Sequence, residues 1–213
     1  MNSRTVITIS KEQLADMPVV AYPGTITIIN TPEQAETAIE TIMRSPVVGF
    51  DTETRPAFRK GQTNNVALMQ VSNGERCWLF RINKLGLEGA VKRFLECDTV
   101  LKVGLSLKDD FFVMHRSAEF EPKNFLDLQA FVKNYMIADA SLQKIYGILF
   151  GERISKGQRL SNWEADELND AQQKYASIDA WACLKIYRHL TDGLFMPEES
   201  PYLTTIVEKE PEE

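Results

Sequence analysis

The chain has 213 residues, of which 44% are hydrophobic and 25% charged, and its formal net charge is −6. These values predict one soluble domain with a sizeable core, and the acidity is weak evidence for or against a nucleic-acid partner. No apolar run approaches the length of a membrane span, and the first residues do not resemble a signal peptide. The histidines and cysteines lack the spacing of zinc ligands. We therefore expect a cytoplasmic protein without membrane contact.

Turn and composition signals divide the chain into three parts. Residues 1–24 are a weakly patterned N-terminal extension that ends at the turn signal Tyr22-Pro23-Gly24. Residues 196–213 are expected to form an acidic, disordered tail, because its final residues lack apolar side chains. The domain itself is predicted to occupy residues 25–195.

The first half of this domain alternates strand and helix signals. A β-branched run at 25–30 predicts a strand, and Thr31 with Pro32 predicts the N-cap and first turn of a helix. An apolar run predicts the next strand at 47–53. The turn signal Asn73-Gly74 then predicts a hairpin. Its strands are expected at residues 66–71 and 77–80.

The second half of the domain is mostly helical in its pattern. A helix at 87–96 and a buried strand at 100–104 are followed by four further helices. Asn169 and Gly193 are typical of the N-terminal cap and the end of the longest one. These four helices are expected at residues 107–115, 127–136, 142–150 and 169–190. A hairpin followed by alternating strands and helices predicts an α/β fold, with a mixed β-sheet flanked by helices.

Two acids lie at the end of the predicted strand at 47–53. Asp51 and Glu53 are two residues apart, so both side chains point to the same face of the strand. Two like charges at the end of a buried strand repel each other and lose hydration, and a bound divalent cation removes that cost. The alternative is a strand end whose acids face water.

Two helices carry further acids. Asp109 and Asp110 are adjacent in an early helical turn, where an acid also stabilises the helix N-terminus, and only one of them can face a given site. Tyr175 and Asp179 are four residues apart on one face of the longest helix, although such a pair can also face solvent. Taken together, carboxylates from a strand and two helices are suited to hold two divalent cations, Mg²⁺ or Mn²⁺, for an in-line phosphoryl displacement.

In this order, Asp51-x-Glu53, Asp110 and Tyr175-x-x-x-Asp179 resemble the three motifs of the DEDDy branch of the DEDD exonuclease superfamily. The similarity runs from about Val47 to about Leu190, most of the chain, and includes a resemblance to the exonuclease domain of the Werner-syndrome protein, with ribonuclease D as a relative. The resemblance implies a ribonuclease-H-like fold and a 3′-5′ exonuclease that uses two divalent metal ions. Its partner would be the 3′ end of DNA or RNA, and its products nucleoside monophosphates.

The resemblance also implies a role for each motif residue. Asp51 would bridge both metal ions. Glu53 and Asp179 would complete the tighter metal site. Asp110, rather than its acidic neighbour, would act on the second ion through water. Tyr175 takes the position that a histidine fills in the sister branch of the superfamily, where it would orient the attacking water.

Residues near the three motifs are candidate nucleic-acid contacts. Basic residues there are able to contact the phosphate backbone, with a solvated basic loop as the alternative. Aromatic and apolar residues there are able to touch or stack on a terminal base, although such residues more often pack in a core. The candidates are Arg55, Arg59, Lys60, Leu68, Met69, Lys156, Arg159 and Trp163.

Two other functions are compatible with the same residues. One is a catalytically silent nucleic-acid-binding or scaffolding module of the same fold. The other is hydrolysis of small-molecule phosphodiesters. A nuclease assay on a labelled strand and on a dinucleotide distinguishes these functions from a 3′-5′ exonuclease.

Overall fold

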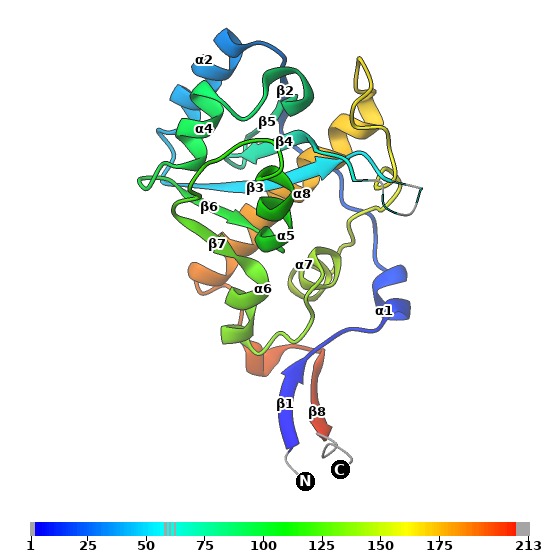
Figure 1. Cartoon of the computed structure of the whole chain (residues 1–213). Helices are drawn as coiled ribbons and strands as arrows, with labels where there is room; N and C mark the ends of the chain where they lie inside the picture. The colour runs from blue at the N-terminus through cyan, green and yellow to red at the C-terminus, as the bar shows by residue number, and fades with distance from the viewer. Residues whose placement is uncertain (1–2, 58, 60, 62, 208–213) are drawn as a thin grey trace.

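The computed structural model describes residues 3–57, 59, 61 and 63–207 (Figure 1). Its main feature is a six-stranded mixed sheet with the strand order β2-β5-β4-β3-β6-β7. Helices lie on both faces of this sheet, which confirms the predicted α/β fold. The strands are β2 Thr25–Ile29, β3 Val47–Thr54, β4 Val66–Ser72, β5 Arg76–Phe80, β6 Leu101–Gly104 and β7 Phe125–Asp127.

Strand β3 lies inside the sheet and has neighbours of both orientations. It pairs antiparallel with β4, which forms the predicted hairpin with β5, and parallel with β6. The outer pairs, β2 with β5 and β6 with β7, are parallel. The end of β3 therefore lies near the middle of the sheet, where helices that follow β6 and β7 can reach it.

The helices form two layers around the sheet. Helix α8 lies across β3, β4, β5 and β6 on one face, whereas α2, α4 and α5 pack on the other. The α-helices are α1 Lys11–Ala15, α2 Pro32–Ile42, α3 Ile82–Leu85, α4 Gly89–Leu95, α5 Leu107–Met114, α6 Leu128–Phe131, α7 Leu142–Phe150 and α8 Asp170–Thr191. Two short 3-10 helices are η1 Val132–Tyr135 and η2 Pro197–Glu199. No helix in the described part of the chain has the length and apolar character needed to cross a bilayer.

Successive side chains of β3 point to opposite faces of the sheet, so they pack alternately against the two layers of helices. Val48 and Phe50 are fully buried in the core beneath α2 and α4. Gly49 faces α8, and a Cβ added to it would lie 1.8 Å from the carbonyl oxygen of Ala180. This glycine allows the helix to approach the strand directly. Asp51, two residues further along, therefore faces the same helix.

The chain ends differ from the sequence-based expectation. Strand β1, Ser3–Ile7, pairs antiparallel with β8, Leu203–Val207, and the two form a small separate sheet beside the domain (Figure 1). The segment predicted as an extension also packs on the domain, since Ile7 and Ile9 are buried there. The segment predicted as a disordered tail contains β8, and its residues 208–213 lie outside the described residues. Local patterns do not reveal a strand whose partner is about 200 residues away.

Two smaller differences lie near the end of the sheet. The predicted helix at 127–136 is split into α6 and the 3-10 helix η1, which stops at Met136 with a φ of 62°. Strand β7 was not expected, because its three residues are too few to show an alternating pattern. Asp127 ends β7 and caps α6, so one residue serves two elements.

Candidate active site

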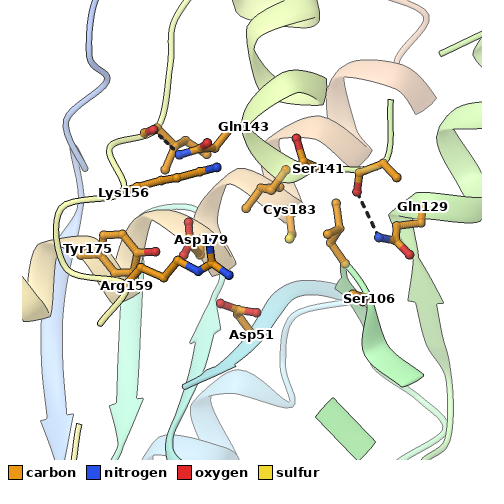
Figure 2. Close-up of a pocket in the computed structure, with 14 residues that line it drawn as sticks. Asp51, Ser106, Gln129, Ser141, Gln143, Lys156, Arg159, Tyr175, Asp179 and Cys183 are labelled. Atoms are coloured by element: carbon orange, nitrogen blue, oxygen red, sulfur yellow. Dashed lines mark hydrogen bonds between the residues drawn. The ribbon is translucent and has the colours of Figure 1, made fainter. Parts of the chain in front are cut away.

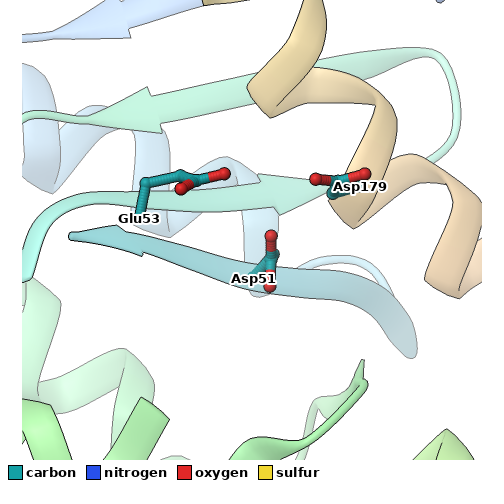
Figure 3. A group of neighbouring side chains, drawn as sticks. All are labelled: Asp51, Glu53 and Asp179. Carbon is teal, nitrogen blue, oxygen red and sulfur yellow. The ribbon is translucent and has the colours of Figure 1, made fainter. Parts of the chain in front are cut away.

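Three of the predicted acids converge where α8 crosses β3. Asp51 and Glu53 project from β3 toward Asp179 on α8 (Figure 3). One carboxylate oxygen from each residue can be chosen so that all three lie within 4.8 Å of one another. The strand places its two acids on one face, and the close helix–strand contact at Gly49 brings the third acid to them.

The fourth predicted acid, Asp110, lies beside this group. It projects from α5 toward β3, where its carboxylate accepts a hydrogen bond from the Thr52 hydroxyl. It is not part of the three-acid group, although its charge acts on Asp51. Its neighbour Asp109 is exposed and accepts a 2.8 Å hydrogen bond from the Ser106 hydroxyl. Of the adjacent pair, Asp110 is thus the acid that faces the site.

The N-terminus of α5 is capped by a residue from another element, Asp127. Ser106 precedes it with a φ of 64°, a left-handed conformation that is unusual for a residue with a Cβ. Its own side chain does not cap the helix. Instead, the Asp127 carboxylate accepts hydrogen bonds from the backbone N–H groups of Ser106 and Leu107, at 3.2 and 2.9 Å. Asp127 thereby fixes the helix that carries Asp110.

Burial raises the pKa of each of the four acids in the site. Burial, and then the charges of Asp179 and Asp110, raise the pKa of Glu53 to about 9. Burial and the three neighbouring acids raise the pKa of Asp51 well above its usual range. Burial also raises the pKa of Asp179 to about 7. The pKa of Asp110 rises to about 7 through burial, against the opposing hydrogen bond from Thr52. These carboxylates need a positive partner to be ionised together at neutral pH.

The acids open into a cavity of about 510 Å³ (Figure 2). Asp51 and Asp179 line it together with Lys156, Arg159 and Tyr175. The positive charge of Arg159 opposes the upward pKa shift of Glu53. A cavity that brings acids and basic side chains together is suited to a ligand that carries phosphate groups and binds through a metal ion.

Tyr175 lies one helical turn before Asp179 and keeps its phenolic proton. Burial, and then the charges of Asp179 and Glu53, raise its pKa above the ordinary value for tyrosine. Its ring packs on the buried Trp163, with the ring centroids 6.0 Å apart. The phenol is therefore held in place by packing and can donate a hydrogen bond into the cavity at neutral pH.

The predicted nucleic-acid contacts divide into three groups. Lys156 and Arg159 line the cavity. Arg55 forms an ion pair with Glu164 at 3.2 Å, Arg59 is exposed, and Lys60 lies outside the described residues. The structure contradicts the remaining three as direct contacts, because their side chains are completely buried and cannot touch a base. These three are Leu68, Met69 and Trp163.

Several cavity residues were not anticipated from the sequence. Gln129 and Gln143 donate their amide groups to backbone carbonyls at 3.0 and 2.6 Å, which shapes the far wall of the cavity. Ser106, Ser141 and Cys183 also line it. Ser141 caps α7, but a capping serine also occurs at many helices that carry no site. These residues lie near the acids only in the folded chain, so no local sequence pattern identifies them.

The acid cluster fits a divalent cation rather than a neutral ligand. Oxygen ligands are those that Mg²⁺ and Mn²⁺ prefer, and a cation stabilises the ionised form of each of these acids. An α/β domain that presents such a cluster in an open cavity has the side chains that divalent metal sites use.

Comparison with known proteins identifies the family. The family model described as 3′-5′ exonuclease matches residues 26–194. The bifunctional 3′-5′ exonuclease/ATP-dependent helicase WRN of Mus musculus is 29% identical over 194 residues, which cover 85% of this chain and 14% of that protein. Because the family model covers most of the chain, the protein belongs to the 3′-5′ exonuclease family.

Solved structures show the same ribonuclease-H-like fold. Escherichia coli RNase D superposes with a TM-score of 0.70 at 20% identity, over 79% of this chain and 44% of that one. The EXO domain of Aedes aegypti Nibbler gives a TM-score of 0.69 at 21% identity, over 82% and 92% of the two chains. At these identities the two structures establish the fold alone.

Proposed function

We propose that the protein is a 3′-5′ exonuclease that hydrolyses the terminal phosphodiester bond of DNA or RNA and releases nucleoside monophosphates. The observation that carries this proposal is the convergence of Asp51, Glu53 and Asp179 on one point in a chain of the 3′-5′ exonuclease family. The cavity beside these acids is also lined by the basic side chains of Lys156 and Arg159. Such an arrangement is suited to a phosphodiester whose charge is shared between a metal site and basic side chains.

The acids are assigned to two divalent cations, Mg²⁺ or Mn²⁺. Asp51 would serve both metal sites, with Glu53 and Asp179 at one and Asp110 at the other. When bound, such cations would supply the positive charge that favours ionisation of an attacking water molecule and stabilises the leaving 3′ oxygen. Asp110, held by the hydrogen bond from Thr52, would act on its ion from beside the three-acid group, through water.

The remaining cavity residues position the substrate. Tyr175 donates a hydrogen bond that orients the attacking water. Arg159 and Lys156 contact the phosphates of the terminal nucleotides, and Arg55 and Arg59 contact the strand further from its end. None of these contacts reads a base edge, so we expect little dependence on sequence.

A nuclease assay on isosteric variants tests this function. Asp51→Asn and Asp179→Asn keep the size of each side chain but remove a charged metal ligand. We expect each to lower the cleavage rate by at least about 10³-fold in Mg²⁺ or Mn²⁺. The substrates are strands labelled at the 5′ end, so that 3′-5′ degradation appears as a ladder of shortened products, and they include single-stranded, recessed-end and RNA forms.

Asp109→Asn is the matched control. Asp109 is adjacent to Asp110 on α5 but exposed, so we expect its amide variant to retain the wild-type rate. Binding of a 3′ end by the wild-type protein without any product in either metal would reject the exonuclease and favour the silent binding module. Full activity of both metal-ligand variants would reject the mechanism.

A short substrate is the second candidate. The cavity volume of about 510 Å³ lies within the range of small-ligand sites. If the protein is a small-molecule phosphodiesterase, a dinucleotide is cleaved faster than any longer strand. If it is an exonuclease, longer strands are cleaved at least as fast, because they add backbone contacts outside the cavity.

A further inference from the structure

Gln70 is a fully buried glutamine whose side chain has no hydrogen-bond partner among the described residues. It is 0% exposed, and both its amide nitrogen and its amide oxygen are unpaired. It lies in β4, directly opposite Asp51 in the antiparallel β3–β4 register. Directly opposite residues share a face of the sheet and have Cβ atoms about 5 Å apart. The amide is therefore next to the acid cluster.

The surroundings of Gln70 would suit an apolar residue. Leu68 precedes it by two residues on the same strand, and Leu79 is its cross-strand partner on β5. Both leucines are completely buried. An amide in this position loses its hydration without gaining a bond, which lowers stability relative to a leucine. Packing therefore does not explain a glutamine here.

The neighbouring Asp51 supplies a reason for the amide. Among the described residues, no side chain donates a hydrogen bond to the Asp51 carboxylate, and the charges acting on it come from Asp179, Asp110 and Glu53. A carboxylate shared by two cations must present a defined oxygen to each of them. A neutral donor beside it restricts its rotation without competing for the cations.

We propose that Gln70 is a positioning residue for Asp51, whose Nε2 group donates to the Asp51 carboxylate when the site holds its cations. This inference rests on the proposed function, because it assigns Gln70 a task in the same metal site. It also goes beyond the three sequence motifs, none of which contains Gln70. The side chain acts through Asp51 and does not itself touch the substrate.

The test compares the full-length wild-type chain with Gln70→Leu and Gln70→Glu. The leucine variant removes the amide, and the glutamate variant keeps its shape but not its N–H donor. In EDTA we expect the melting temperature of Gln70→Leu to equal or exceed the wild-type value. In both variants we expect the Mg²⁺ dissociation constant, measured by titration calorimetry, to rise about 10–100-fold. We expect kcat to fall with little change in KM for the strand.

Ser72→Ala is the matched control. Ser72 is the next residue on the same face of β4, is also completely buried, and lies opposite Gly49 rather than opposite an acid. Its hydroxyl donates to the carbonyl of Arg76 and accepts from the N–H of Gly74, both in the hairpin turn. We expect its loss to lower the melting temperature and to leave Mg²⁺ binding unchanged.

The possible outcomes separate this inference from the proposed function. If the wild-type protein binds Mg²⁺ and cleaves strands but Gln70→Leu and Gln70→Glu bind Mg²⁺ equally well, Gln70 has no positioning role and the exonuclease assignment stands. A lower melting temperature of Gln70→Leu in EDTA, with unchanged Mg²⁺ binding, likewise assigns the amide to packing. If the wild-type protein neither binds Mg²⁺ nor cleaves, both proposals are wrong.

Discussion

The acids at the end of β3 lower the stability of the domain unless a cation binds there. Glu53, Asp110 and Asp179 keep their protons to a higher pH in the folded chain than in the unfolded one, with folded pKa values of about 9, 7 and 7. Between about pH 4 and these values, the folded chain therefore binds more protons than the unfolded chain does. The stability contributed by these groups is complete at low pH and is lost as the pH rises.

This difference predicts how pH and metal affect stability. In EDTA, we expect the melting temperature to fall as the pH is raised from about 5.5 to about 8.5. Mg²⁺ should raise the melting temperature more at the higher pH, because the acids must be ionised to bind it. Thermal unfolding monitored by circular dichroism measures both effects.

Asp179→Asn is the control for this pH dependence. It removes one of the four acids whose pKa is raised, so the fall in EDTA should be smaller than in the wild type, and so should the Mg²⁺ effect. A wild-type melting temperature in EDTA that stays constant or rises over this range would contradict the proposed charge repulsion.

Tyr175 is predicted to contribute a hydrogen bond to catalysis but no proton transfer. Its pKa is raised above the ordinary tyrosine value, so it does not ionise near neutral pH. We expect Tyr175→Phe to lower kcat by roughly 10²-fold without changing the shape of the pH–rate profile. Steady-state kinetics over a range of pH measure both quantities.

Tyr135→Phe tests whether loss of any buried phenol has the same effect. The Tyr135 hydroxyl donates to the carbonyl of Leu190, away from the acids, at 3.2 Å. Its removal should lower stability by about 1 kcal/mol and leave kcat unchanged. Equal kinetic losses in the two variants would mean that Tyr175 acts only through the fold.

At the scale of secondary structure, the site depends on the close contact of α8 with β3. Asn169 starts α8 with a capping box, and small residues line the face of the helix that meets the sheet. Gly49 lies beneath Ala180, one residue beyond Asp179. The separation between Asp51 and Asp179 is therefore set by how closely the two backbones approach.

Gly49→Ala is expected to separate the two elements. The added Cβ would lie 1.8 Å from a backbone oxygen, which a side-chain rotation cannot relieve. We expect a loss of at least about 3 kcal/mol in the free energy of unfolding. Displacement of Asp179 should also lower kcat by roughly 10²-fold in the folded fraction. Urea unfolding and single-turnover kinetics measure the two effects.

Gly157→Ala is the matched substitution at an unhindered position. There the nearest atom to an added Cβ is the Ser155 hydroxyl oxygen at 3.5 Å, an ordinary contact distance. We expect a change in stability within about 0.5 kcal/mol. If Gly49→Ala were equally mild, α8 would not be held against β3 in the way described.

At the scale of the whole molecule, the two ends of the chain are joined to the domain and to each other. Ile7 is completely buried, its N–H donates to the carbonyl of Met136, and its carbonyl accepts from the N–H of Ala138. Strand β1 therefore connects β8 to the segment that follows η1. Strand β1 is thus part of the folded unit rather than an appendage.

Ile7→Ala should therefore lower the free energy of unfolding as much as a substitution in a hydrophobic core does. We expect it to lower the free energy of unfolding by about 2–5 kcal/mol, since it leaves a cavity in a packed cluster. Ile206→Ala, on the partner strand β8, removes an apolar side chain that is 38% exposed and should cost less than about 1 kcal/mol. If both substitutions had similar, small effects on the free energy of unfolding in urea, the β1–β8 sheet would contribute little to the stability of the domain.

The sequence alone predicted most elements of the main sheet and its helices. Helix α7 was predicted with its observed bounds, and the N-caps Thr31 and Asn169 are those observed. These features are local: a cap and a hydrophobic period are completed within a few residues, so they are readable without a fold. Family resemblance added the roles expected of the acids, which spacing alone did not distinguish from surface charge.

What only the tertiary structure decided involves contacts between distant segments. The pairing of β1 with β8, the burial of Trp163 and the position of Asp110 at Thr52 each depend on neighbours that no local pattern specifies. The same holds for Gln70, which looks like an ordinary strand residue until its register places it opposite Asp51. A sequence records which side chains are present, but burial and charge interactions depend on distances that only the packed chain sets.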